Sequence, residues 1–230
     1  LSNTEALVCL ATFAYEHPDY SWPEITAEQQ PPHFRARSLA HPLINSAVRV
    51  FNDITLDDAT RAWMITGSNM SGKSTMLRSI GTAIALAQAG APVCAEALCM
   101  SELRMRTSIR VDDSLAEGTS RFYAEVLALK EVVDAVGEDR PPVLFLLDEV
   151  FHGTNSHDRT EGARGLLRSL LSLGACGLVT THDLALAEIA DDLAPRACNV
   201  HFDDALVEGE MRFDYRLKPG PVTRSNALAI

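Results

Sequence analysis

The sequence lacks the features of a membrane protein, a disulfide-rich secreted protein or a tight nucleic-acid binder. No apolar run approaches the roughly 20 residues that cross a bilayer, and no basic-then-apolar signal peptide opens the chain. The five cysteines are odd in number and form no CxxC pair, which favours reduced thiols in a cytoplasmic protein over disulfides or a zinc site. Basic residues number 20 against 31 acidic ones, and so acidic a surface repels the phosphates of nucleic acid.

Length and composition indicate a globular protein. The 230 residues are enough for one large α/β domain, and a hydrophobic content of 47% excludes disorder as the overall state. The chain starts at Leu1 and stops inside an apolar stretch, residues 226–230. We therefore expect it to be a piece of a longer protein.

Apolar strand patterns alternate with helical patterns, which predicts a mostly parallel sheet covered by helices on both sides. Buried strands are expected at 62–66, 143–147 and 175–180, and helices at 3–16, 73–89, 121–136, 158–173 and 184–190. Alternating stretches at 34–56 and 197–217 predict further strands, the first of them in a small antiparallel annex. Four prolines predict an irregular connection over 17–32.

A glycine-rich loop between a predicted strand and a predicted helix carries the strongest chemical signal. Residues 67–74 match the pattern G-x-x-x-x-G-K-[ST]. Glycine lets the backbone fold round phosphates with its N–H groups inward, and the helix N-terminus adds partial positive charge. We expect Lys73 to neutralise the β- and γ-phosphates and the Ser74 hydroxyl to bind Mg²⁺. The expected ATP-binding residues are Gly67, Ser68, Asn69, Met70, Ser71, Gly72, Lys73, Ser74 and Thr75.

Two adjacent acids, Asp148 and Glu149, follow the apolar strand at 143–147. Because side chains alternate along a strand, the two acids can hold different roles. We expect Asp148 to reach Mg²⁺ through water, and Glu149 to orient or deprotonate the attacking water. Capping of the next helix is the alternative for the pair. His182 closes another strand and can hydrogen-bond the γ-phosphate, so the expected catalytic residues are Lys73, Glu149 and His182.

Four stretches together resemble the ATPase domain of the MutS mismatch-repair family, within the ABC-type ATPases. They are residues 66–75, 113–122, 147–155 and 181–183, in the family's order and spacing, and the likeness extends over most of the chain from about Arg37. The resemblance implies an α/β P-loop NTPase fold of the ABC/MutS type, with ATP and Mg²⁺ as cofactors. Residues 34–230 would form the ATPase domain, and residues 1–33 would lead from upstream domains.

The resemblance also implies a head-to-tail homodimer with two nucleotides held between the subunits. Ser120, in the segment 118–120, would reach the γ-phosphate bound by the other subunit. An ordinary N-capped helix explains the segment 118–120 nearly as well. Val50, between Arg49 and Phe51, lies where the family packs against adenine.

The sequence departs from the family pattern at several positions. Ser68 and Ser71 stand where proline and glycine are usual, and Glu117, Thr119 and the pair 151–152 replace other typical residues. These departures indicate a divergent MutS relative. Mismatch-reading and clamp domains are absent from these residues, so contact with DNA is expected only through other domains of the protein.

Three functions are compatible with these motifs. The first is a nucleotide-switched, Mg²⁺-dependent ATPase module that drives conformational change in attached DNA-handling domains. The second is a non-hydrolysing module whose ATP serves only to join two subunits, a role against which Glu149 argues. The third is the ATPase module of a transporter or chromosome-structure protein, but the transporter signature Leu-Ser-Gly-Gly-Gln and a long coiled-coil insertion are both missing.

Overall fold

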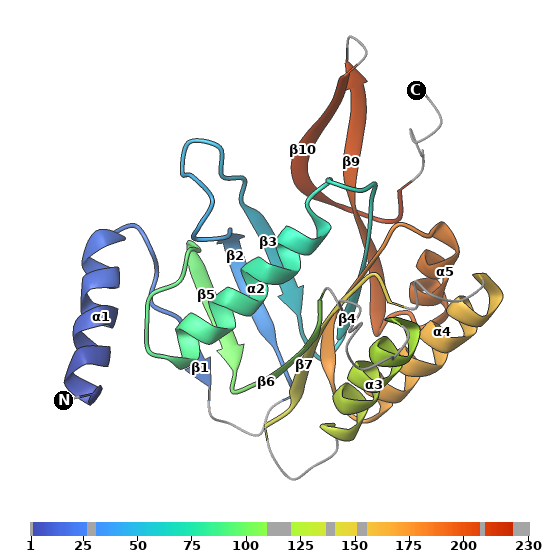
Figure 1. The fold of residues 1–230 in the computed structure, drawn as a ribbon, viewed down its shortest axis with the longest axis horizontal. Coiled ribbons are helices and arrows are strands. Elements are labelled where there is room, and N and C mark those ends of the chain that lie inside the picture. The colour runs from blue at the N-terminus through green and yellow to red at the C-terminus, as the bar shows by residue number, and fades with distance from the viewer. Residues whose placement is uncertain are drawn as a thin grey trace.

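Two β-sheets and the helices that pack on them form the described part of the chain (Figure 1). The computed structural model describes residues 2–26, 31–109, 121–136, 141–150, 156–207 and 210–222. Its helices are α1 (Ser2–Glu16), α2 (Lys73–Gln88), α3 (Arg121–Asp134), α4 (Ser156–Ser172) and α5 (Leu184–Asp192). Its strands are β1 (Glu24–Thr26), β2 (Phe34–Leu39), β3 (Asn52–Leu56), β4 (Ala62–Thr66), β5 (Ala97–Ser101), β6 (Arg104–Ser108), β7 (Val143–Asp148), β8 (Cys176–Thr181), β9 (Ala197–Val207) and β10 (Glu210–Pro219).

The larger sheet has six strands in the order β10-β9-β4-β8-β7-β6. Every neighbouring pair from β6 to β9 is parallel, and β10 alone runs antiparallel, as the partner of β9. Strand β7 is buried on both faces of the sheet, which explains its continuous apolar run. Leu144 and Leu146 face one core cluster, whereas Phe145 and Leu147 face the other. The prediction of a mostly parallel sheet flanked by helices is confirmed.

The two core clusters lie on opposite faces of this sheet. On one face, α2 packs against the six-stranded sheet and also against apolar side chains of the smaller sheet, such as Phe34 and Ile54. On the other face, α3, α4 and α5 cover β7, β8 and β4 (Figure 1). Burial of α2 between two apolar surfaces fixes its N-terminus, and with it the loop that precedes the helix.

The smaller sheet confirms the predicted annex only in part. Its order is β1-β5-β2-β3, and β2 pairs antiparallel with both β3 and β5. The parallel pair of β1 with β5 makes the sheet mixed rather than antiparallel. The prediction of an irregular connection over 17–32 is therefore wrong at Glu24–Thr26. A three-residue edge strand fits between Pro23 and the prolines at 31 and 32, and so short a strand leaves no periodic pattern in the sequence.

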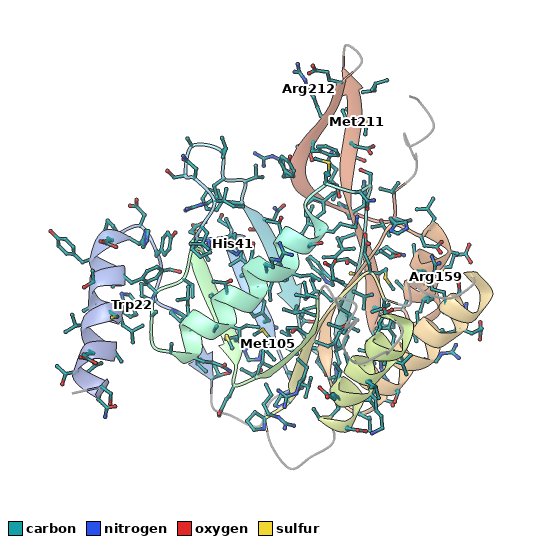
Figure 2. The ribbon with its side chains drawn as sticks, viewed as in Figure 1. Trp22, His41, Met105, Arg159, Met211 and Arg212 are labelled. Carbon is teal, nitrogen blue, oxygen red and sulfur yellow. The ribbon has the colours of Figure 1, made fainter. Side chains whose placement is uncertain are left out.

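Two elements project from this body. Helix α1 has no buried residue. The distal part of the β9–β10 hairpin, which carries Met211 and Arg212, extends beyond the other strands of its sheet (Figure 2). Within the described ranges, no helix is both long and apolar enough to cross a membrane. The division of the chain at residue 33 stays a prediction, although β1 ties part of the first segment to the smaller sheet.

Candidate nucleotide-binding site

The glycine-rich loop leaves β4 at Thr66 and enters α2 at Lys73. Two of its glycines are required by geometry. Gly67 has φ 150°, and a Cβ there would lie 2.7 Å from Ser71 Oγ and 3.0 Å from the carbonyl oxygen of Phe202. Gly72 has φ 110°, and a Cβ there would lie 3.3 Å from the ring of Tyr215. Gly72 is also the N-cap of α2 and supplies no side-chain cap, so no capping side chain competes with an anion for the first N–H groups of the helix.

Lys73 is the buried cation of the loop. Its Nζ donates to the carbonyl oxygens of Gly67 and Ser68, both at 2.8 Å, and lies 3.7 Å from Glu149 Oε1. The side chain is only 4% exposed. Burial lowers the pKa of Lys73, and the charges of Glu149 and Asp148 oppose that shift. The ammonium group is therefore held inside the loop against a carboxylate.

The side chains of Asp148 and Glu149 differ in their surroundings, as expected. The cause is not the alternation of side chains along the strand. Strand β7 ends at Asp148, and Glu149 has φ 53°, a left-handed backbone conformation outside the strand. Its N–H donates to both the carbonyl and the hydroxyl oxygen of Thr180, each at 3.1 Å. The Thr180 hydroxyl in turn donates to Asp148. Thr180 therefore holds the turn that points Glu149 toward Lys73.

His182 lies beside Glu149 at the end of β8. Its Nδ1 is 3.3 Å from Glu149 Oε1, the oxygen that also faces Lys73. Asp183 is the N-cap of α5 and accepts a hydrogen bond from the N–H of Ala185. This capping role accounts for an aspartate directly after His182. The carboxyl ends of β4, β7 and β8 thus bring together the three residues expected to be catalytic, Lys73, Glu149 and His182.

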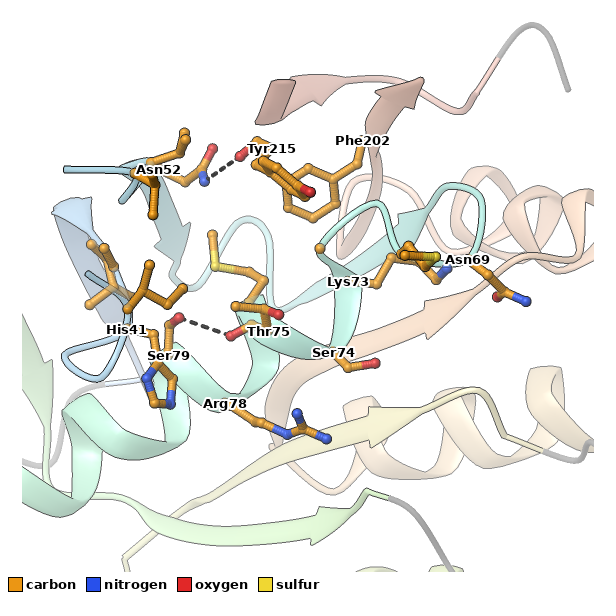
Figure 3. Close-up of a pocket in the computed structure, with 18 of the residues that line it drawn as sticks. His41, Asn52, Asn69, Lys73, Ser74, Thr75, Arg78, Ser79, Phe202 and Tyr215 are labelled. Atoms are coloured by element: carbon orange, nitrogen blue, oxygen red, sulfur yellow. Dashed lines mark hydrogen bonds between the residues drawn. The ribbon is translucent and has the colours of Figure 1, made fainter. Parts of the chain in front are cut away.

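A cavity of about 670 Å³ opens beside this cluster (Figure 3). Six of the expected loop residues line it, namely Asn69, Met70, Gly72, Lys73, Ser74 and Thr75. Gly67, Ser68 and Ser71 do not line it, and the Ser71 side chain is buried beneath the loop against Gly67. The volume suits a drug-sized ligand or a nucleotide.

Most of the remaining lining of the cavity comes from residues that the sequence patterns did not single out for binding. They are Leu39, Ala40, His41, Ile44, Val48, Asn52, Met76, Arg78, Ser79, Phe202 and Tyr215. Burial, followed by the positive charges of Arg78 and Arg49, lowers the pKa of His41 and so favours the neutral form of the ring at the cavity wall. No local pattern around His41, or in β9 or β10, indicates a binding role.

Tyr215 forms one end of this wall. Its backbone is in the left-handed region at φ 54°, at an irregularity in the pairing of β9 with β10. The Asn52 side chain donates to the Tyr215 carbonyl oxygen at 3.0 Å and accepts from the N–H of Leu217 at 2.7 Å. These two bonds fix the backbone around Tyr215, and Figure 3 shows the bond to the Tyr215 carbonyl oxygen. The Tyr215 ring lies against Gly72.

Val50 lines the cavity, whereas its neighbours Arg49 and Phe51 line a second cavity on the other side of the same segment. The placement of Val50 on the nucleotide side is compatible with the expected adenine contact. Ser120 and the stretch 151–155 lie outside the described residues, so their expected roles stay predictions.

The residues near the loop suit a magnesium ion that arrives with a nucleotide. Ser74 contributes a hydroxyl at the cavity wall, and Asp148 a carboxylate one residue before Glu149. Across the described residues, no group of three His, Cys, Asp or Glu side chains could hold a metal by itself. Mg²⁺ commonly keeps several waters and takes one or two protein ligands plus phosphate oxygens, which this pair of oxygen donors fits.

Comparison with known proteins agrees with this geometry. The family model of MutS domain V matches residues 63–230. The chain is 32% identical over its whole length to a DNA mismatch repair protein MutS 2 of Halobacterium salinarum, and 34% identical over its whole length to a DNA mismatch repair protein MutS of an Exiguobacterium species. It is also 34% identical to an endonuclease MutS2 of Thermus thermophilus over 83% of the chain.

The chain spans about a quarter of the length of these relatives, 26%, 27% and 25% respectively. The family match covers the phosphate loop, both acids and His182 in the positions described above. The chain belongs to the MutS family, and its residues 63–230 correspond to domain V.

Proposed function

We propose that this chain binds ATP with Mg²⁺ and hydrolyses it to ADP and phosphate, as the ATPase module of a MutS-like protein of the mismatch-repair type. The observation that carries the proposal is the placement of Lys73 and Glu149, 3.7 Å apart, at the edge of a cavity of about 670 Å³. A phosphate-binding cation and a carboxylate that can take a proton thus meet at one ligand-sized site. Titration of the chain with ATP and Mg²⁺, followed by release of phosphate, tests it directly.

Each residue of the cluster then has a distinct task. Lys73 exchanges the carbonyl oxygens of Gly67 and Ser68 for the β- and γ-phosphates, while loop N–H groups and the N-terminus of α2 bind the remaining phosphate oxygens. Ser74 and Asp148 would hold the Mg²⁺, which neutralises developing charge on the phosphates. Glu149 accepts a proton from the attacking water, and His182, beside it, hydrogen-bonds the γ-phosphate.

The adenine base of the nucleotide would lie against the part of the cavity wall formed by Val50, Asn52 and Tyr215. Tyr215→Ala is expected to weaken ATP binding about tenfold, because an aromatic face that stacks on a base contributes about 1–3 kcal/mol. Tyr215→Phe keeps the ring and is expected to bind ATP like the wild type. Calorimetric titration measures both; equal affinities for wild type and Tyr215→Ala would place the base elsewhere.

We further propose that the complete site is formed by two copies of the chain, with Ser120 of one copy completing the site of the other. The support is the family membership and the exposure of the loop residue Met70, which is 84% exposed beside the cavity. Specific ATPase activity is therefore expected to rise with protein concentration. Phosphate release measured over a dilution series tests this, and a specific rate that stays flat on dilution would contradict a composite site.

Attached domains of the longer protein would carry contact with DNA and would move when the nucleotide changes. The net charge of −11 supports this division of labour, since an acidic module is a poor ligand for DNA. One observation favours the non-hydrolysing alternative: Lys73 and His182 both approach the same oxygen of Glu149. A carboxylate held in that way binds water only after Lys73 turns to the phosphates.

A further inference from the structure

The loop between β2 and β3, residues 40–51, is an irregular segment with a cavity on each side. His41, Val48 and Val50 line the nucleotide-side cavity, and Ile44 lines both cavities. The second cavity, of about 850 Å³, lies between this loop and residues 16–20, which comprise the last residue of α1 and the four that follow it. A wall that separates two cavities has few packed neighbours and needs another source of rigidity.

Few backbone bonds support this loop. Its internal backbone bonds include those from Ile44 N–H to the His41 carbonyl and from Val48 N–H to the Asn45 carbonyl, both at 3.1 Å. Both close single turns, and neither joins the loop to the sheet. Exposure is correspondingly high, with Val48 70% and Leu43 88% exposed. The loop therefore depends on side chains for its shape.

Arg49 supplies that support through one guanidinium group. Its Nε and one terminal nitrogen donate to the carbonyl oxygen of Ile44, at 3.1 and 2.6 Å, and that same terminal nitrogen also donates to the carbonyl oxygen of Pro42 at 3.0 Å. The other terminal nitrogen lies 3.2 Å from the sulfur of Cys94. Cys94 is buried, and its own carbonyl oxygen accepts from the N–H of Ala40. The planar guanidinium group of Arg49 thus links Pro42 and Ile44 of the loop to each other and to Cys94 outside the loop.

Aromatic side chains continue this contact toward α1. The guanidinium carbon lies 5.9 Å from the centroid of the Tyr20 ring, within the range of a cation–π contact. Tyr20 stacks on His17 with centroids 4.5 Å apart, and Phe13 of α1 contacts both rings. Arg49 is therefore fixed on the side of the loop that faces away from the nucleotide cavity.

We infer that Arg49 is a positioning residue for the base of the nucleotide: it holds the β2–β3 loop in the shape that presents Ile44 and Val50 to the cavity. This inference rests on the proposed function. It predicts that Arg49 matters for the base and ribose but not for the phosphates, because the phosphate loop is held separately, by β4, α2 and Lys73.

The test compares two ligands, ATP and inorganic tripolyphosphate, each titrated with Mg²⁺ into the full chain. Arg49→Met keeps most of the apolar stem and removes every donor. It is expected to weaken ATP binding about tenfold, since several charge-assisted bonds are lost from the loop. Tripolyphosphate binding is expected to stay within about twofold of the wild type. Arg49→Lys is expected to show most of the same loss, because an ammonium group lacks the planar fork.

Arg35→Met is the matched control, because it makes the same charge change on the outer face of β2, where Arg35 pairs with Asp57 at 3.4 Å. It should leave both affinities unchanged. Equal weakening of both ligands by the two Arg49 variants, or unchanged ATP binding, would overturn the role of Arg49 alone. A wild-type chain that bound neither ligand would instead overturn the proposed function together with the role built on it.

Discussion

Lys73→Ala is expected to weaken ATP binding by about 100-fold or more. Charged hydrogen bonds contribute about 1.5–3 kcal/mol each, and Lys73 is the cation of the loop that reaches the cavity. The substitution also removes the two hydrogen bonds that Lys73 donates to the carbonyl oxygens of Gly67 and Ser68. Binding of a fluorescent ATP analogue, with the thermal unfolding midpoint measured in parallel, separates loss of ligand contact from loss of fold.

Lys130→Ala is the control for this experiment. It removes the same charge from an exposed site on α3, where Lys130 pairs with Asp134 one helical turn away. ATP affinity should not change in this variant, because an exposed ion pair contributes little to stability and Lys130 does not line the cavity. If Lys73→Ala kept wild-type affinity while remaining folded, the cavity beside the loop would not be the phosphate site.

Glu149→Gln is expected to lower ATP turnover about 100-fold or more while ATP binding is kept. General-base catalysis contributes about 10²–10⁴-fold to rate, and glutamine has no carboxylate to accept the proton. The change is isosteric, and the backbone bonds from Glu149 to Thr180 do not involve the side chain. Affinity for ATP is expected to stay equal or rise, because a negative charge near the phosphates is removed.

Phosphate release and ATP binding are measured on the same samples, at a protein concentration high enough to favour pairs of chains. Glu96→Gln provides a matched control, since Glu96 is an exposed acid that pairs with Arg37 on the smaller sheet. Three outcomes are informative. A large fall in the turnover of Glu149→Gln, with ATP binding retained, supports Glu149 as the general base. Equal and measurable rates in wild type and variant exclude that role. Equal and negligible rates in both proteins favour the non-hydrolysing alternative.

The proposed phosphate side of the site was recognisable in the sequence because its parts are local. A glycine loop between a strand and a helix, and polar residues at the ends of buried strands, are each encoded within a few residues. The strands β4, β7 and β8, which precede Lys73, Glu149 and His182, were predicted for the same reason. The edge strand β1 was missed, because three residues are too few for a periodic pattern.

The proposed base side of the site was not predictable from local patterns, because its residues meet only in the folded chain. Asn52 and Tyr215 are more than 160 positions apart, yet one hydrogen bond joins them across the two sheets, and a second joins Asn52 to Leu217. Arg49 and Val50 are adjacent but face different cavities, a division that depends on where Cys94 and Tyr20 lie.

The glycine-rich loop, the acids at the end of β7 and the family resemblance can be read from the sequence alone. The folded chain is needed to see that Glu149 turns toward Lys73, through the left-handed backbone held by Thr180, and that the Tyr215 ring lies against Gly72. The difference lies in the range of the interactions. Loop and strand propensities act over a few residues, whereas the cavity wall that includes Asn52 and Tyr215 is built by contacts between distant segments, which form when both sheets pack on α2.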